Sequence, residues 1–255
     1  ASTAADVILS SAAESTRYAE EFYTNAPSGV LFRHCYPSIN TPVADTVHPV
    51  DRERQIICIT RFGAGDSHKG GQELPKAIGP AMKGHSLAVM AGSGEIDHAL
   101  EAALSEKAGQ HGVHLRFLHQ LGDEEKFLEI KRSALMVFLS FFEGFGYPPV
   151  EALYCDTPCV VYDLPVLREV SGDALIYVPH GDEIDLQNAI GRVLSGRYRP
   201  PFSLSEHIAP TARFEAYASR LDDLMEELTS LPYEPAATRA PVSVQRATRR
   251  RFFVT

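Results

Sequence analysis

Two glutamates, Glu143 and Glu151, lie eight positions apart in the stretch SFFEGFGYPPVEALYCDTPCVV, which covers residues 140–161. Two carboxylates around a short turn can act as a general acid and a general base. They can also accept hydrogen bonds in pairs, which suits the vicinal hydroxyls of a ribose or a hexose. The glycines between them leave the backbone N–H groups open to a ligand. The stretch therefore predicts a polar binding corner with bare backbone.

A second loop, TRFGAGDSHKGG at residues 60–71, combines glycines with Arg61 and Lys69. It is not a P-loop, because His68 and Gly70 stand where that motif needs glycine before the lysine and serine or threonine after it. Neither this loop nor AGSGEID completes the dinucleotide fingerprint, which argues against an ATPase and a dehydrogenase. The guanidinium and the ammonium suit a diphosphate bound without Mg²⁺. A solvated pair of surface cations is the alternative.

Short apolar runs separated by helical patterns set the fold class. Their nearly continuous Val, Ile and Leu content is typical of parallel strands covered on both faces. We predict an open, doubly wound, Rossmann-like α/β sheet whose ligands bind at the carboxyl ends of the strands. The expected strands are QIICIT (55–60), SLAVMA (86–91), VHLRFL (113–118), LMVFL (135–139), PCVVYD (158–163) and LIYV (175–178).

The two glutamates belong to a corner between a strand and a helix. The strand is expected to end at Ser140, and Pro148 and Pro149 are expected to begin the helix, where a missing N–H costs nothing. This places free N–H groups and the positive helix end at the mouth of the sheet. Glu151 is expected in the first turn of the helix, where helix capping is the alternative role. Glu143 is expected in the loop before it.

Composition limits the class of protein. With 255 residues, of which 44 % are hydrophobic, the chain can form a sizeable core. It contains no run of eighteen apolar residues and does not open like a signal peptide, so we expect a soluble, cytoplasmic protein. The net charge of −9 argues against nucleic acid as a partner. The cysteines are expected to be reduced core thiols rather than disulfides or metal ligands: Cys35, Cys58, Cys155 and Cys159.

Four segments follow from the pattern along the chain. Residues 1–50 contain a strand, a helix and a strand, too little for a domain, and residues 51–200 form the predicted α/β domain. Residues 201–230 are expected to be a proline-rich link and an amphipathic helix that packs on this domain. Residues 231–255 form a basic tail, with five arginines and one glutamate. A flexible or peripherally packed tail is the simplest interpretation, and contact with an anionic membrane or partner is the alternative.

Several motifs occur together in this chain: Arg61, the KGG that starts at Lys69, FLHQLGDEEKF, and SFFEGFGYPPVEALYCDTPCVVYDLPVLREVSGDALIYV. Two glutamates separated by seven residues enclose GFG, and E-A-x-x-C-x-T-P-x-V-x-x-D and R-E-V-x-G-D-A follow. From about residue 52 to about residue 195, this combination resembles the nucleotide-binding domain of retaining GT-B glycosyltransferases of the family 4 type.

The resemblance implies a role for each motif. Arg61 and Lys69 would bind the diphosphate of a nucleotide sugar and stabilise the leaving nucleoside diphosphate. Glu143 would lie beside the hydroxyls of the donor sugar, and Glu151 would hold the ribose hydroxyls. Neither glutamate need be a nucleophile, because the departing phosphate would help to deprotonate the acceptor. The other implied contacts are backbone N–H groups that face the sugar and its phosphate, and a segment that borders the base: Gly144, Phe145 and Gly146, and Leu118, His119 and Gln120.

The implied reaction is transfer of a hexose, with mannose favoured, to a glycan, a lipid-linked sugar or a small molecule, with retention of configuration and without a metal. The preference for mannose comes from EGFGYPPVEAL, whose style is frequent among mannosyltransferases of surface-polysaccharide pathways. We expect a cytoplasmic protein, with peripheral contact to the inner membrane face as an option. A non-catalytic nucleotide-sugar-binding subunit, or half of a split enzyme, is the alternative, and a GT-B-like epimerase fits the glutamate spacing less well.

The sequence departs from the family pattern in places. Asp156 stands where the family usually has a helix-ending glycine, and His119 stands where a glycine is common. The interval from Arg61 to Lys69 carries the extra loop GAGDSH. A GT-B enzyme has two α/β domains, and residues 1–50 resemble only the end of the first. We therefore expect the acceptor-binding domain elsewhere, in the same or another chain, and slow transfer by this chain alone.

Overall fold

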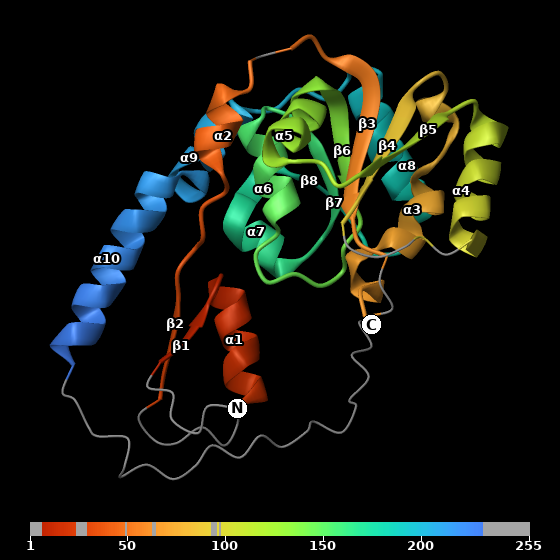
Figure 1. Cartoon of the computed structure of the whole chain (residues 1–255). Coiled ribbons are helices and arrows are strands. Elements are labelled where there is room, and N and C mark those ends of the chain that lie inside the picture. Colours follow the sequence, from red (N-terminus) through yellow and green to blue (C-terminus); the bar gives the residue numbers. More distant parts are fainter. Residues whose placement is uncertain are drawn as a thin grey trace.

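A computed structural model of the chain describes residues 7–23, 30–48, 50–62, 65–92, 96 and 98–231. Its centre is a parallel sheet with the strand order β5-β4-β3-β6-β7-β8 (Figure 1). The strands are β3 (Glu53–Thr60), β4 (Ser86–Ala91), β5 (His114–His119), β6 (Ser133–Phe138), β7 (Cys159–Tyr162) and β8 (Ile176–Val178). The predicted doubly wound sheet is confirmed, with each apolar run at its expected place to within two residues.

The direction in which the chain adds strands reverses at the centre of the sheet. From β3 the chain moves outward to β4 and β5, then returns to pair β6 with the other edge of β3. In such sheets the connections on the two sides of this switch point leave a crevice at the carboxyl ends of the strands. The loops after β3 and β6 therefore meet at this crevice.

Helices cover both faces of the sheet (Figure 1). Side chains that follow one another along a strand enter opposite clusters, because a strand alternates its faces: Ile57 and Met136 point to one cluster, Ile56 and Val137 to the other. The first cluster is covered by α2 (Thr41–Thr46), α5 (Asp123–Arg132), α6 (Tyr147–Tyr154), α7 (Pro165–Ser171) and α9 (Leu204–Ala212). The second is covered by α3 (Leu74–Ala77), α4 (His98–His111) and α8 (Glu183–Leu194).

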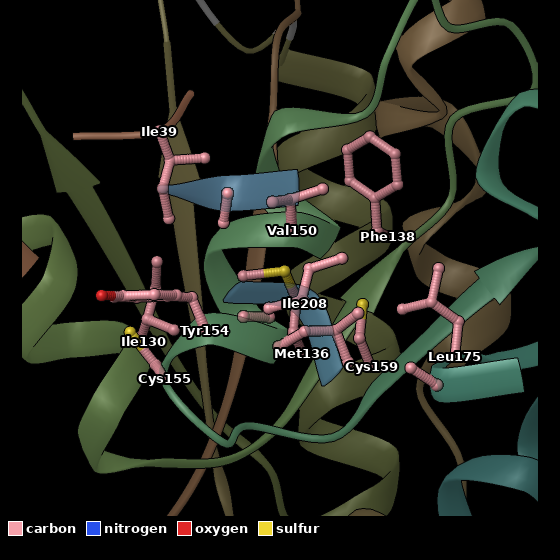
Figure 2. Close-up of a cluster of buried hydrophobic side chains, with 14 of the residues drawn as sticks. Ile39, Ile130, Met136, Phe138, Val150, Tyr154, Cys155, Cys159, Leu175 and Ile208 are labelled. Atoms are coloured by element: carbon pink, nitrogen blue, oxygen red, sulfur yellow. The ribbon is translucent and has the colours of Figure 1, made fainter. Parts of the chain in front are cut away.

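Figure 2 shows part of the first cluster, where Met136 of β6, Val150 of α6 and Ile208 of α9 gather. All four cysteines are buried and unpaired, as expected for core thiols. Burial raises the pKa of Cys58 and of Cys155 to about 12, which disfavours the reactive thiolate. Among the residues that the structure describes, no helix combines the length and apolar character needed to cross a membrane.

The segment before the sheet forms the expected strand, helix and strand: β1 (Val7–Ser10), α1 (Ala13–Phe22) and β2 (Leu31–His34). β1 and β2 pair in parallel as a separate two-stranded sheet. Figure 1 shows this piece beside the loops at the carboxyl edge of the larger sheet. Its assignment to the end of a preceding domain remains a prediction.

The segment after the sheet departs from the expected link. Residues 204–212 form α9, which packs on α6, and the helix tolerates Pro210 in its last turn. The second helix, α10 (Phe214–Ser230), carries the expected apolar stripe, but of that stripe only Leu224 is buried, and Phe214 and Met225 are about half exposed. The basic tail lies outside the described residues, apart from Leu231.

The helix α6 begins one residue earlier than expected. Gly146 adopts a left-handed conformation (φ 90°, ψ 59°) as its N-cap, so Tyr147 is the first helical residue. Glu151 is therefore the fifth residue and lies in the second turn, not the first. Asp156 ends the helix segment with φ 53°, the left-handed conformation anticipated for this position. Its carboxylate accepts hydrogen bonds from the backbone N–H and the hydroxyl of Ser205 at 2.9 Å, and so fixes the start of α9.

Gly70 brings the loop after β3 directly onto the end of β6. Its φ is +71°, and a Cβ atom there would lie 1.9 Å from the carbonyl oxygen of Leu139. Because the obstacle is backbone, no side-chain movement can relieve it. The glycine thus sets the distance between the Lys69 loop and the chain that leads to Glu143.

We predict that Gly70→Ala lowers the free energy of unfolding by about 2–4 kcal/mol, through the clash and the strained φ. Gly109→Ala is the matched control, because Gly109 lies in α4 with nothing within 4 Å of its Cβ position. It should raise stability by about 0.5–1 kcal/mol. Urea denaturation measures both, and a Gly70→Ala protein as stable as the parent would contradict the packing described.

Candidate functional site

A cavity of about 910 Å³ opens at the carboxyl ends of the central strands. Its size lies within the range of roughly 300–1,000 Å³ that is usual for small-molecule sites. The walls come from the ends of β3, β4, β5 and β6, from the loops that follow them, and from the start of α6. The lining residues are Ile59, Thr60, Arg61, Lys69, Met90, Ala91, Gly92, His119, Gln120, Leu121, Phe138, Glu143, Tyr147 and Pro148.

Lys69 and Glu143 form an ion pair inside this cavity. The distance from Lys69 Nζ to Glu143 Oε1 is 2.8 Å, and the two side chains are 17 % and 10 % exposed. Lys69 ends the short 3₁₀ helix η1 (Ser67–Lys69) after β3, and Glu143 lies in the loop after β6, so the pair spans the switch point. Charge-assisted hydrogen bonds of this kind are among the strong ones, and this one joins the two loops that the sequence analysis selected.

Backbone contacts fix the Lys69 loop. The hydroxyl of Thr60 donates to the Lys69 carbonyl at 2.9 Å. The His68 carbonyl accepts from the Ser140 hydroxyl at 3.0 Å and from the Phe141 N–H at 2.9 Å. The loop after β3 and the chain after β6 thus hold one another at the positions from which Lys69 and Glu143 project.

Arg61 lies at the mouth of the cavity and is about half exposed, with its nearest carboxylate, Asp66, at 3.4 Å. A Cβ atom at Gly92 would lie 3.0 Å from Arg61 Cγ, so the arginine stem crosses this glycine closely. Gly92 was not singled out from the sequence, although a glycine directly after a strand is a recognisable signal for such an approach. Arg61 therefore leaves a guanidinium available at the same edge as Lys69.

The turn between Glu143 and α6 presents backbone rather than side chains. Phe145 is buried in the core, 2 % exposed, so only its backbone can face a ligand. Within the described part of the chain, no hydrogen bond occupies the N–H groups of Gly144, Phe145, Gly146 or Tyr147. The two prolines of α6 supply no N–H, so the free donors at this corner come mainly from the turn.

Glu151 does not line the cavity. It lies one helical turn beyond Tyr147 and Pro148, which do, and it is only 7 % exposed. Its Oε1 accepts a hydrogen bond from Lys126 Nζ at 2.8 Å, and Lys126 also contacts Asp123 at 2.9 Å. Burial raises the pKa of Glu151, and the Lys126 ammonium opposes this rise. Lys126 belongs to the motif FLHQLGDEEKF, but its contact with Glu151 could not be assigned from the sequence, because it arises only when α5 packs on α6.

The end of β5 supplies the opposite wall. His119 and Gln120 line the cavity with Leu121, whereas Leu118 is partly buried and packs against the first core cluster. Gln120 has φ 53°, which is uncommon for a residue other than glycine. Five of the ten residues selected from the sequence thus line the cavity, and the other five adjoin it: Gly144, Phe145, Gly146, Glu151 and Leu118.

The described residues contain no group of three or more His, Cys, Asp or Glu side chains arranged to hold a metal ion. Arg61 and Lys69 supply cationic side chains at the cavity. The turn beside them adds backbone N–H groups that have no hydrogen-bond partner among the described residues. This combination suits an anionic ligand with hydroxyl groups, because the cations and N–H groups donate and the carboxylate of Glu143 accepts.

Residues 48–213 match the protein family described as glycosyl transferases group 1. This chain belongs to that family. It is 27 % identical over 194 residues to the O-antigen chain mannosyltransferase RfbU of Salmonella typhimurium strain LT2, across 76 % of this chain and 50 % of the Salmonella protein. The chain therefore spans half the length of that relative.

Solved structures place the fold of this member of the group 1 family in a wider context. Sucrose-phosphate synthase from Thermosynechococcus elongatus superposes with a TM-score of 0.67 at 21 % identity, over 89 % of this chain and 59 % of the synthase. The pneumococcal O-GlcNAc transferase GtfA, solved with UDP and GlcNAc, gives 0.65 at 14 % identity, over 89 % of this chain and 46 % of the transferase. The chain has the Rossmann-like fold of one GT-B half, as the resemblance implied.

We predict that Lys126→Met lowers the free energy of unfolding by about 2–4 kcal/mol at neutral pH, because it leaves the Glu151 carboxylate buried without its partner. In the variant, burial without Lys126 raises the pKa of Glu151 in the folded state above its value in the unfolded chain. The stability of the variant therefore falls as the pH rises above the ordinary carboxyl range. The deficit should therefore shrink between about pH 7 and about pH 5. Urea denaturation across this range measures it.

Lys76→Met is the control for this prediction, because the pair between Lys76 and Glu73 has a similar length of 2.7 Å but a more exposed lysine. Its cost should stay under about 1 kcal/mol at every pH. A Lys126→Met deficit that is equal to the control, or that does not change with pH, would show that Glu151 is not held as a buried anion.

Proposed function

We propose that this chain is the donor-binding half of a glycosyltransferase that moves a hexose from a nucleotide diphosphate sugar to an acceptor. The observation that carries the proposal is the pair between Lys69 and Glu143 inside a cavity at the switch point of the sheet. Membership of the group 1 family supports it independently. The donor chemistry then follows from what each group at the cavity can bind.

The cations receive the diphosphate. Lys69 and Arg61 neutralise its charge, and the free N–H groups of Gly144, Phe145 and Gly146 add donors from the turn. As the bond between the sugar C1 and the phosphate oxygen breaks, negative charge grows on the nucleoside diphosphate, and these fixed groups stabilise it. In this proposal the protein supplies the positive charge, and transfer is independent of a metal ion.

The carboxylates receive the hydroxyls. When a phosphate takes over Lys69, the Glu143 carboxylate is left to accept hydrogen bonds from the donor hexose. Glu151 uses one oxygen for Lys126, and no described residue donates to its other oxygen, Oε2. We assign this oxygen to the ribose hydroxyls. The base lies against the end of β5, with His119 and Gln120 beside it.

The proposed reaction retains the configuration at C1. The acceptor hydroxyl forms its bond to C1 on the face that the phosphate leaves, and its proton passes to a departing phosphate oxygen, so neither glutamate forms a covalent bond. Mannose is our preferred sugar, supported by the name of the Salmonella relative. The acceptor is a glycan, a lipid-linked sugar or a small molecule of a polysaccharide pathway, met in the cytoplasm with peripheral contact to the inner membrane face.

A second candidate follows from the chain spanning half of the Salmonella relative. A nucleotide-sugar-binding subunit without activity of its own, or half of a split enzyme, would need the same donor site. We place the acceptor-binding domain in the same or another chain. Turnover on addition of such a domain distinguishes a catalytic half from a subunit that only binds.

The test is calorimetric titration of a panel of GDP, UDP, ADP and dTDP sugars into the parent protein and into Lys69→Ala. We expect one donor class to bind the parent, and Lys69→Ala to raise its Kd at least about tenfold, because a charge-assisted contact to phosphate is lost. Lys76→Ala, which removes a lysine from an ion pair outside the cavity, should change the Kd less than about twofold. Absence of binding at millimolar concentration, or equal binding by Lys69→Ala and the parent, would refute the assignment.

A further inference from the structure

One face of the α1 segment contacts the residues on both sides of Glu143. The hydroxyls of Ser11 and Ser15 both donate to the carbonyl oxygen of Gly144, at 2.9 and 2.6 Å. The ring of Tyr18 lies against that of Phe142, with 5.7 Å between their centroids. Ser15 and Tyr18 are three positions apart on α1 and share one face, and Ser11 lies directly before the N-cap residue Ala12. The contacts thus hold the neighbours of Glu143 and leave its carboxylate to Lys69.

The α1 segment is itself fixed to the larger sheet domain. Glu169 of α7 accepts hydrogen bonds from the backbone N–H groups of Ala13 and Glu14, at 2.7 and 2.8 Å. These N–H groups open α1 and have no partner within the helix, and a carboxylate is favourable at a positive helix end. Glu169 also accepts from the Tyr36 hydroxyl at 2.6 Å. Both serines therefore belong to a segment fixed to the sheet domain, with Ser15 on α1 and Ser11 directly before its N-cap.

The Gly144 contact sets the direction of a backbone donor. The Gly144 carbonyl and the Phe145 N–H belong to one planar trans peptide unit, so they point in opposite directions. Because the carbonyl points at the two serines, the Phe145 N–H points away from α1. Gly144 has no side chain, so its backbone dihedral angles are weakly restricted. The two serine hydroxyls restrict the orientation of this peptide unit instead.

We propose that Ser11 and Ser15 are positioning residues for the donor site, which hold the Gly144 peptide and thereby orient Glu143 and the N–H groups of the turn toward the donor sugar. The inference rests on the proposed function, because that function assigns the turn to the donor. It adds that a segment outside the nucleotide-binding sheet determines how well the sugar, rather than the nucleotide, is recognised.

The first test needs no ligand. Backbone ¹⁵N relaxation of the full chain is compared by NMR between the parent, Ser11→Ala/Ser15→Ala, and Thr16→Ala. Thr16 is the matched control, because its hydroxyl lies on the same helix but donates to Ala12 and Arg33 carbonyls and not to the turn. The double variant should lower the order parameters of the N–H groups of residues 144–147, and Thr16→Ala should not. Unchanged order parameters in the double variant would overturn the positioning role.

The second test separates sugar from nucleotide. By calorimetry, the double variant should lose about tenfold in affinity for the nucleotide sugar but no more than about threefold for the matching nucleoside diphosphate, because Lys69 and Arg61 still hold the diphosphate while the turn that faces the sugar and its phosphate loses its restraint. Ser15→Thr in the Ser11→Ala background retains a hydroxyl and should recover most of the affinity. Equal weakening for both ligands, or for Thr16→Ala, would overturn the proposal.

The two tests also distinguish a failure of the proposed function from a failure of the inference about Ser11 and Ser15. Lower order parameters in the double variant, together with no nucleotide-sugar binding by the parent, would overturn the proposed function and the sugar-orienting role. They would still establish that the serines restrain the turn. Nucleotide-sugar binding by the parent that the serine substitutions do not alter would overturn only the inference about α1.

Discussion

The ion pair between Lys69 and Glu143 is the contact on which the site depends. It spans 2.8 Å between loops that follow β3 and β6, and both side chains are largely removed from water. A charge in that position is costly without a partner, so each group needs either the other or an opposite charge from a ligand. The surrounding backbone keeps the two loops at this distance: Gly70 lies against the Leu139 carbonyl, and the His68 carbonyl is held from the β6 side.

The same logic applies to the second glutamate. Glu151 lies one turn along α6 and has its own lysine, Lys126, so the two carboxylates are not coupled to each other as an acid and a base. Each carboxylate instead pairs with its own lysine, Glu143 with Lys69 and Glu151 with Lys126. The left-handed N-cap at Gly146, where a Cβ atom would lie 2.4 Å from Leu167 Cδ2, fixes the helix that carries Glu151 relative to the turn that follows Glu143.

Much of this arrangement could be predicted from the sequence, for physical reasons. Buried parallel strands need nearly continuous apolar runs, and the runs from QIICIT to LIYV marked all six strands. The residues at strand ends, such as Arg61, Lys69 and Glu143, followed from the rule that ligands bind at that edge. The prediction that Glu151 lies in the first turn of α6 was wrong. The left-handed Gly146 starts the helix at Tyr147, which places Glu151 in the second turn. The helix α9 was not predicted, because the prolines around it indicated a link. Its start is stabilised by hydrogen bonds from Ser205 to Asp156, which lies far away in the sequence. Lys126, Ser11 and Ser15 act through contacts between distant elements, for which no local pattern exists.

The central claim is that the cavity around Lys69 and Glu143 holds a nucleotide sugar, and a crystal structure of the protein with the donor selected by calorimetry tests it most directly. We expect phosphate oxygens within hydrogen-bonding distance of Lys69 Nζ and the Arg61 guanidinium, hexose hydroxyls on Glu143, and ribose hydroxyls on Glu151. A donor bound with its diphosphate away from Lys69, or with the sugar and the ribose contacting neither glutamate, would contradict it.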